Sequence, residues 1–252
     1  MDQAFPAWRA RIGIIYPASG LADMEYYRLC PSGVSVHLTR SSVPNDGGVT
    51  LADVLEVAAG RQFTQLAEDL ATVRPHALAW MCTSGSFSRG AAWDAELCRT
   101  LMAHGRCAAT TTSTALVTAL HALDVRRLAL ATPYEHPVME RLVAYLAEHG
   151  ITVVSCAGLG LIRDWDISTL TPMDLISLVR EADSPEAEAV FLSDTCVVLS
   201  PLVEMLEADL GKPVFSANMA TMWHALRLAG VNDSPLGFGS LKGLHPAREP
   251  PA

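Results

Sequence analysis

The two halves of the sequence repeat each other in order, and this repetition constrains the fold more than any other feature. Three pairs of segments are similar, with offsets of 116, 112 and 106 residues. The pairs are residues 11–17 and 127–133 (RIGIIYP and RLALATP), 77–84 and 189–196 (ALAWMCTS and AVFLSDTC), and 106–120 and 212–226 (RCAATTTSTALVTAL and KPVFSANMATMWHAL). Three pairs in the same order indicate a duplicated lobe.

Short apolar runs alternate with helical patterns along the chain, which is typical of an α/β fold with a parallel sheet. Strands are predicted at residues 11–16, 34–38, 77–81, 107–109, 127–131, 152–157, 189–193 and 213–215. Helices are predicted at residues 51–71, 91–104, 113–123, 137–149, 172–181, 201–210 and 219–229. We expect two pseudo-symmetric lobes, each with a mostly parallel sheet flanked by helices, and an active-site cleft between them. The predicted lobes are residues 1–113 with 221–252, and residues 114–220.

Residues 82–86 (CTSGS) place a thiol and several hydroxyls where a predicted strand passes into a helix. The free N–H groups of a helix start hold anions, and the hydroxyls of Thr83 and Ser84 add donors, so this stretch indicates a carboxylate site. The same field lowers the pKa of a thiol from about 8.5 toward neutrality, which would make Cys82 a nucleophile or a base. The alternative is that Thr83 and Ser84 cap the helix while Cys82 packs in the core.

The repeat places Asp194, Thr195 and Cys196 opposite this stretch. Because ligands of open α/β sheets bind beyond the carboxyl ends of the strands, both stretches should face one cleft. Cys82 and Asp194 would then form a paired acid/base arrangement. The alternative for Asp194 is a helix cap.

Three further residues are expected at the cleft because each lies at the end of a predicted strand. Pro17 and Tyr134 follow the ends of two equivalent strands, and a tyrosine there can donate to a developing enolate or carboxylate oxygen. The alternative for Tyr134 is a surface aromatic. Asn218 lies at a helix start, where it either binds substrate or caps the helix.

Composition argues against several other classes of protein. A net charge of −9 with no basic run disfavours a nucleic-acid surface. The apolar runs are too short to span a membrane, the first residues lack a signal-peptide layout, and the six cysteines form no C-x-x-C motif, so we expect a cytoplasmic protein. The histidines lack ligand spacing and no nucleotide-binding motif is intact, so we expect no metal and no cofactor.

Five segments together resemble the aspartate/glutamate racemase superfamily, in the branch of maleate cis-trans isomerases and arylmalonate decarboxylases. They are YPASGL (residues 16–21), CTSGSFSRG (82–90), TTTSTALVTAL (110–120), ATPYEHPVMERL (131–142) and SANMATMWHALRLAG (216–230). The resemblance implies two pseudo-symmetric lobes, a small carboxylate bound between them and chemistry without a cofactor. It places the first-lobe cysteine of the branch on Cys82 and its carboxylate-binding hydroxyls on Thr83, Ser84 and Tyr134.

The sequence departs from this branch in the second lobe. The second cysteine of the branch falls on Asp194, and Cys196 stands two residues further along. Gly20 and Met139 stand where isomerases tend to carry asparagine, and decarboxylases resemble this chain at Gly20.

The preferred hypothesis is a maleate isomerase-like enzyme with Cys82 as the nucleophile. Decarboxylase-like or racemase-like proton transfer at a carboxylate α-carbon, and a non-catalytic carboxylate-binding protein, remain alternatives. A homo-oligomer is compatible with the sequence.

Overall fold

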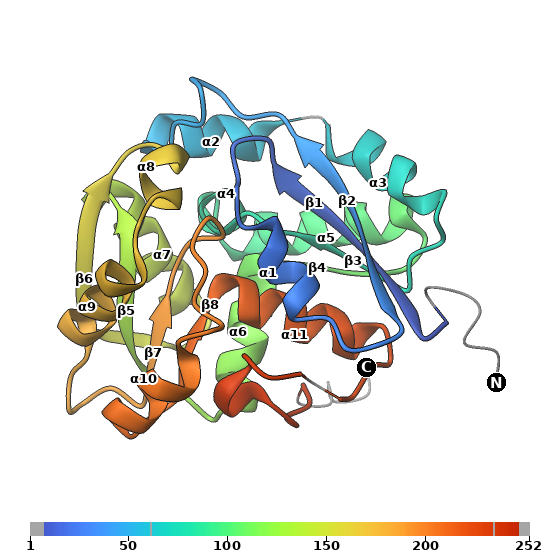
Figure 1. The fold of residues 1–252 in the computed structure, drawn as a ribbon. Coiled ribbons are helices and arrows are strands. Elements are labelled where there is room, and N and C mark those ends of the chain that lie inside the picture. Colours follow the sequence, from blue (N-terminus) through green and yellow to red (C-terminus); the bar gives the residue numbers. More distant parts are fainter. Residues whose placement is uncertain (1–7, 61, 234, 247–252) are drawn as a thin grey trace.

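The computed structural model describes residues 8–60, 62–233 and 235–246, and it contains two parallel sheets of four strands each. The strand orders are β2-β1-β3-β4 and β6-β5-β7-β8. The strands are β1 (Ala10–Pro17), β2 (Val34–Ser41), β3 (Ala77–Trp80), β4 (Ala108–Thr111), β5 (Arg127–Tyr134), β6 (Thr152–Leu161), β7 (Ala189–Leu192) and β8 (Val214–Ser216). The sheets lie side by side with helices on their faces, so the predicted α/β fold with two similar lobes is confirmed (Figure 1).

The two sheets fall within the two predicted lobes, and the boundaries of those lobes stay a prediction. Residues 1–7, 61, 234 and 247–252 of the predicted lobes lie outside the described residues.

Most predicted helices are present, with two differences. The helices are α1 (Asp23–Arg28), α2 (Leu51–Ala59), α3 (Phe63–Ala71), α4 (Thr83–Phe87), α5 (Ala91–Gly105), α6 (Thr112–Ala122), α7 (His136–Glu148), α8 (Asp164–Ser168), α9 (Pro172–Ala182), α10 (Val203–Leu210) and α11 (Ala217–Leu228), followed by a 3₁₀ turn (Gly239–Leu241). The single helix predicted at residues 51–71 is wrong, because α2 ends at Ala59 with Gly60 as its C-cap and α3 begins at Phe63. The short helices α1 and α8 were not predicted, since segments of five or six residues carry too little periodicity. Helix α4 begins at Thr83, where the sequence predicts a helix start after Cys82.

The strand register agrees with the repeat in the first two segments. Ile12 of β1 pairs with Ala77 of β3, and Leu128 of β5 pairs with Ala189 of β7. Equivalent positions in the two sheets therefore differ by 116 and 112 residues, as the sequence alignment predicts.

The third repeated segment is shifted by one residue from the prediction. Thr111 caps α6 by accepting from the N–H of Thr114 at 3.1 Å, and Ser216 caps α11 by accepting from the N–H of Met219 at 3.3 Å. These equivalent caps are 105 residues apart, so the predicted offset of 106 is wrong. The hydrogen bond to the third residue fixes the helix start, whereas the similarity of small residues nearby does not.

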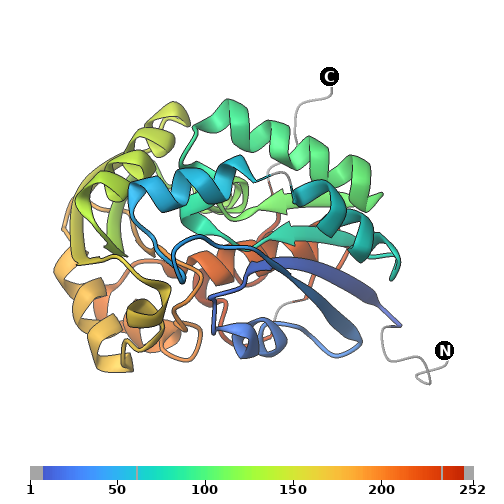
Figure 2. The same ribbon diagram turned by 90° about the horizontal axis from the view of Figure 1, so that it is seen from above.

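Helices from both halves cross the junction between the sheets. Helices α6 and α11 pack against each other there (Figure 1). Helix α2 of the first half contacts α7 of the second, and Figure 2 shows it from above, reaching across the junction.

A buried carboxyl group on α5 also ties the two halves together. Asp94, 1% exposed, accepts hydrogen bonds from the hydroxyls of Thr111, Thr114 and Tyr145. Tyr145 lies on α7 of the second half, whereas Asp94 lies on α5 of the first. The carboxylate thus accepts from the buried hydroxyls of Thr111 and Tyr145 and from the half-buried hydroxyl of Thr114.

We expect Asp94→Ala to lower the free energy of unfolding by about 3 kcal/mol or more, because it leaves two buried hydroxyls and one half-buried hydroxyl without their acceptor. Urea denaturation followed by circular dichroism measures this loss. The control is Glu96→Ala, which removes an exposed carboxylate paired with Arg99 on the same helix and should change stability little. Equal stability of the two variants would contradict a structural role for Asp94.

Candidate active site

The loops that follow central strands of the two sheets meet at the junction. Thr195, after β7, donates through Oγ1 to the carbonyl oxygen of Met81, after β3, at 3.3 Å. The hydroxyl of Tyr16 in β1 donates to the carbonyl oxygen of Thr195 at 2.9 Å. The carboxyl ends of strands from both sheets therefore face one another, where parallel α/β sheets bind ligands.

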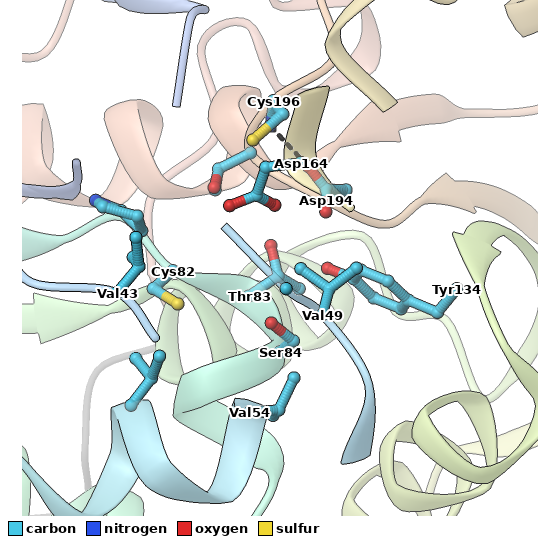
Figure 3. Close-up of a pocket in the computed structure, with 14 residues that line it drawn as sticks. Val43, Val49, Val54, Cys82, Thr83, Ser84, Tyr134, Asp164, Asp194 and Cys196 are labelled. Atoms are coloured by element: carbon cyan, nitrogen blue, oxygen red, sulfur yellow. Dashed lines mark hydrogen bonds between the residues drawn. The ribbon is translucent and has the colours of Figure 1, made fainter. Parts of the chain in front are cut away.

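A pocket of about 380 Å³, including its open mouth, lies at this meeting point (Figure 3). Its lining residues are Pro17, Val43, Gly48, Val49, Val54, Val57, Cys82, Thr83, Ser84, Tyr134, Asp164, Asp194, Thr195 and Cys196. The structure thus brings together every site residue predicted from the sequence except Asn218.

Asn218 has a different place from the one predicted. Its side-chain amide donates to the carboxylate of Glu25 and to the carbonyl oxygens of Thr195 and Val197. Ser216, not Asn218, caps α11. Asn218 therefore holds the loop that carries Asp194 and Cys196, and it does not line the pocket.

Asp194 enters the pocket from a left-handed backbone conformation. Its φ angle is 94°, in the region that favours glycine, and its carboxylate accepts a hydrogen bond from the N–H of Cys196. Helix α10 begins only at Val203, so the alternative role of Asp194 as a helix cap is excluded.

Asp164 lines the pocket although the sequence pattern did not predict it. It begins α8, and its N–H donates to the carbonyl oxygen of Gly47 at 2.9 Å. Gly48 and Arg163 form an antiparallel bridge beside this bond, which joins the loop before α2 to the loop after β6. No repeated partner marks Asp164 in the sequence, so only this pairing identifies it.

Four valines form an apolar wall of the pocket. Val43 and Val49 come from the loop before α2, and Val54 and Val57 come from α2 itself. This wall was not predicted from the sequence, because valines in an amphipathic helix are typical of an ordinary core.

Cys82 is buried and precedes the first residue of α4. Burial raises the pKa of its thiol to about 12, and the charges of Asp164 and Asp194 act in the same direction, whereas the N–H of Gly85 lowers it. The predicted shift toward neutrality is therefore wrong, because desolvation outweighs the field of a five-residue helix. A Cβ at Gly85 would lie 2.8 Å from the Cys82 sulfur, so a larger residue at position 85 would clash with the thiol.

Two carboxyl groups and a thiol lie together on one side of the pocket (Figure 3). A carboxylate oxygen of Asp164, a carboxylate oxygen of Asp194 and the Cys196 Sγ all lie within 4.8 Å of one another. Burial raises the pKa of Asp194, and burial followed by the charge of Asp194 raises the pKa of Asp164 to about 7. Carboxylate and thiolate groups can ligate metals, so the expected absence of a metal stays a prediction.

The three predicted carboxylate-binding residues, Thr83, Ser84 and Tyr134, all line the pocket. Thr83 Oγ1 is buried and has no hydrogen-bond partner within the described protein, so Thr83 does not cap α4. Tyr134 is 2% exposed, which excludes a surface role, and burial keeps its pKa well above the usual value. Tyr134 therefore stays a neutral donor, and Ser84 lies beside Thr83 (Figure 3).

Comparisons with known proteins agree with this architecture. The arylmalonate decarboxylase family model matches residues 49–242. Arylmalonate decarboxylase of Bordetella bronchiseptica is 34% identical over 222 residues, which cover 86% of this chain and 89% of that protein. Maleate isomerase of Nocardia farcinica is 35% identical over 129 residues, covering 50% of this chain and 51% of that one.

Solved structures extend the likeness over nearly the whole chain. A liganded double mutant of arylmalonate decarboxylase superposes with a TM-score of 0.83 at 33% identity, covering 92% of this chain and 98% of that one. Maleate isomerase from Pseudomonas putida S16 with maleate has a TM-score of 0.85 at 23% identity, covering 93% and 98%, and shows the shared fold.

The two similar lobes and the pocket between them define a two-lobed α/β enzyme of the aspartate/glutamate racemase type. Within that class, the chain belongs to the arylmalonate decarboxylase family, in the branch that includes the maleate isomerases. The resemblance inferred from the sequence is thereby confirmed. Among the described residues, no helix is long and apolar enough to cross a membrane.

We expect Thr83→Val to leave the free energy of unfolding unchanged or higher, because the lost hydroxyl has no partner within the described protein. The matched control is Thr112→Val, which removes a hydroxyl that donates to the carbonyl oxygen of Trp80 at 3.1 Å and should cost about 1 kcal/mol. Thermal denaturation of both variants without ligand measures the difference. Similar destabilisation in both would mean that the Thr83 hydroxyl serves the fold.

Proposed function

We propose that this enzyme transfers a proton to the α-carbon of a small carboxylate with an apolar substituent, as an arylmalonate decarboxylase-like enzyme. The observation that carries the proposal is the lining of the pocket. Hydroxyl donors and four valines line it together, and the Cys82 thiol lies among them. A substrate with one retained carboxylate and one apolar group matches both kinds of lining residue.

The hydroxyls of Thr83, Ser84 and Tyr134 would bind the retained carboxylate. Each can donate to an oxygen, and Thr83 has a donor to spare. The substituent would pack on the valine wall, and this contact excludes water from the reacting carbon. When carbon dioxide leaves, its bonding electron pair stays on the α-carbon and spreads into the retained carboxylate, where the same hydroxyls stabilise the added charge.

Cys82 would then protonate the α-carbon. Its raised pKa keeps it a neutral thiol, which is a proton donor in the resting enzyme rather than a nucleophile. The new C–H bond takes the proton, and the electron pair of the S–H bond stays on sulfur as thiolate. A nearby protonated carboxyl group of Asp164 or Asp194 can return a proton to that thiolate.

Maleate isomerase-like chemistry is the second candidate. Cys82 stands where the resemblance places the isomerase nucleophile, and the isomerase of Nocardia farcinica is 35% identical over half of this chain. In that reaction the sulfur would add to the double bond while Asp194 supplies a proton to the neighbouring carbon, and rotation and elimination would follow. The valine wall ranks this candidate second, because maleate carries no apolar substituent that would pack against the valines.

The proposal is tested by incubating the enzyme with phenylmalonate and, separately, with maleate in deuterated water. We expect phenylmalonate to yield phenylacetate with one deuterium at the α-carbon, and maleate to remain unchanged, as followed by NMR. Fumarate formation from maleate without loss of phenylmalonate would replace the proposal with the isomerase. Deuterium exchange without loss of carbon dioxide would indicate racemase-like proton transfer.

We expect Cys82→Ser to lower kcat by roughly 10²–10⁴-fold with little change in KM, because a hydroxyl is a much weaker acid than a thiol. Steady-state kinetics on the active substrate measure the effect. The control is Cys98→Ser, a buried cysteine outside the pocket, which should retain activity. Retained activity in Cys82→Ser with loss in Cys196→Ser would assign the proton donor to the other lobe.

A further inference from the structure

The strongest unassigned feature is the pair of carboxyl groups formed by Asp164 and Asp194. Asp164 begins α8 and Asp194 follows β7, so separate loops of the second half bring them together. Their oxygen atoms lie within 4.8 Å of each other and of the Cys196 sulfur. Both side chains are almost fully buried, at 6% and 3% exposed.

The described residues around the pair donate hydrogen bonds to it, but no cationic side chain among the pocket-lining residues offsets its negative charge. Ser19 Oγ donates to Asp164, and the N–H of Cys196 donates to Asp194. Among the described residues that line the pocket, none is lysine, arginine or histidine. Two carboxylates this close in a buried site repel each other strongly, so ionising both is costly.

Other ionisable groups that face the pair come from each neighbouring element. They are Tyr16 of β1, Cys82 after β3, Tyr134 of β5 and Cys196 after β7, and burial raises the pKa of each. Arg163 and Asp166 flank Asp164 in sequence, but their side chains are exposed. The facing groups are therefore neutral near pH 7, which leaves the two carboxyl groups to titrate against each other.

The pair also faces the place where a ligand would bind. Thr83 Oγ1, buried and without a partner within the described protein, lines the same pocket. A proton held by the pair is therefore within the site and not in a separate part of the core.

We propose that Asp164 and Asp194 share a single proton near neutral pH, and that Asp164 is the positioning residue that keeps this proton in the pocket. With this proton the pair carries one net negative charge. Without it the pair would carry two negative charges, which would oppose the entry of an anionic substrate. In turnover the shared proton passes to the Cys82 thiolate, and the pair then takes a proton from solvent. This last use rests on the proposed function, whereas the sharing itself does not.

The sharing is tested without substrate by NMR of the protein labelled with ¹³C at the aspartate Cγ, titrated from acid to alkaline pH. We expect the resonances of Asp164 and Asp194 to titrate together in two steps, with the second step near neutral pH. The variants Asp164→Asn and Asp194→Asn assign the two resonances. Two independent one-step curves, or two carboxylates that stay ionised into acid as a bound metal would cause, overturn the proposal.

Two variants should move the titration in opposite directions. In Asp164→Asn the neighbouring charge is gone, so Asp194 should lose its proton about one pH unit or more lower than the second step of the parent. In Ser19→Ala the loss of a donor to Asp164 should move the second step to higher pH, because that bond favours the charged form. A merely structural role for Asp164 would leave the Asp194 curve in place.

The same shifts should appear in the alkaline limb of the pH profile of kcat. The alkaline limb should move to lower pH in Asp164→Asn and to higher pH in Ser19→Ala, because activity needs the proton of the pair. If phenylmalonate is not decarboxylated while the NMR shifts appear, the proposed function fails and the shared proton stands. If the NMR curves are independent while phenylmalonate yields phenylacetate, the shared proton fails and the proposed function stands.

Discussion

Burial of acidic groups in a pocket without a cation is the constraint on which the rest of the site depends. Asp164, Asp194, Cys82 and Cys196 all lie in it, and desolvation raises the pKa of each. A charged form is therefore costly for every one of them, so the resting pocket holds protons. The proposed proton transfer to a carbon atom would draw on these protons, and the neutral Cys82 thiol carries one of them.

The fold supports this pocket by fixing the loop after β7 from both halves. Glu25, fully buried on α1, accepts from the N–H groups of Leu199 and Ser200 and from the amide of Asn218. Asn218 in turn binds carbonyl oxygens of the same loop. These contacts tie the loop that carries Asp194 to α1 and α11, so a residue of the first half helps to fix a loop of the second.

The two halves share the same arrangement of strands, but they carry different side chains at equivalent positions of the pocket. Cys82 of the first half is equivalent to Asp194 of the second. Two residues further along, Ser84 is equivalent to Cys196. At these positions the first copy contributes a thiol and two hydroxyls, whereas the second contributes a carboxyl group, a hydroxyl and a thiol. The segments without a repeated counterpart, the valine wall and the start of α8, give the pocket its apolar face and its second carboxyl group.

Local sequence determined the two-lobed α/β fold and eight of the nine predicted pocket residues, because strand ends in parallel sheets point to one edge and the repeat shows which ends are equivalent. Tertiary structure alone decided the rest. Asp164 and the valines reach the pocket through a backbone bridge between Gly48 and Arg163, which no periodic pattern encodes. The pKa of Cys82 also rises because packing from both halves removes water from the thiol, and desolvation depends on neighbours distant in sequence.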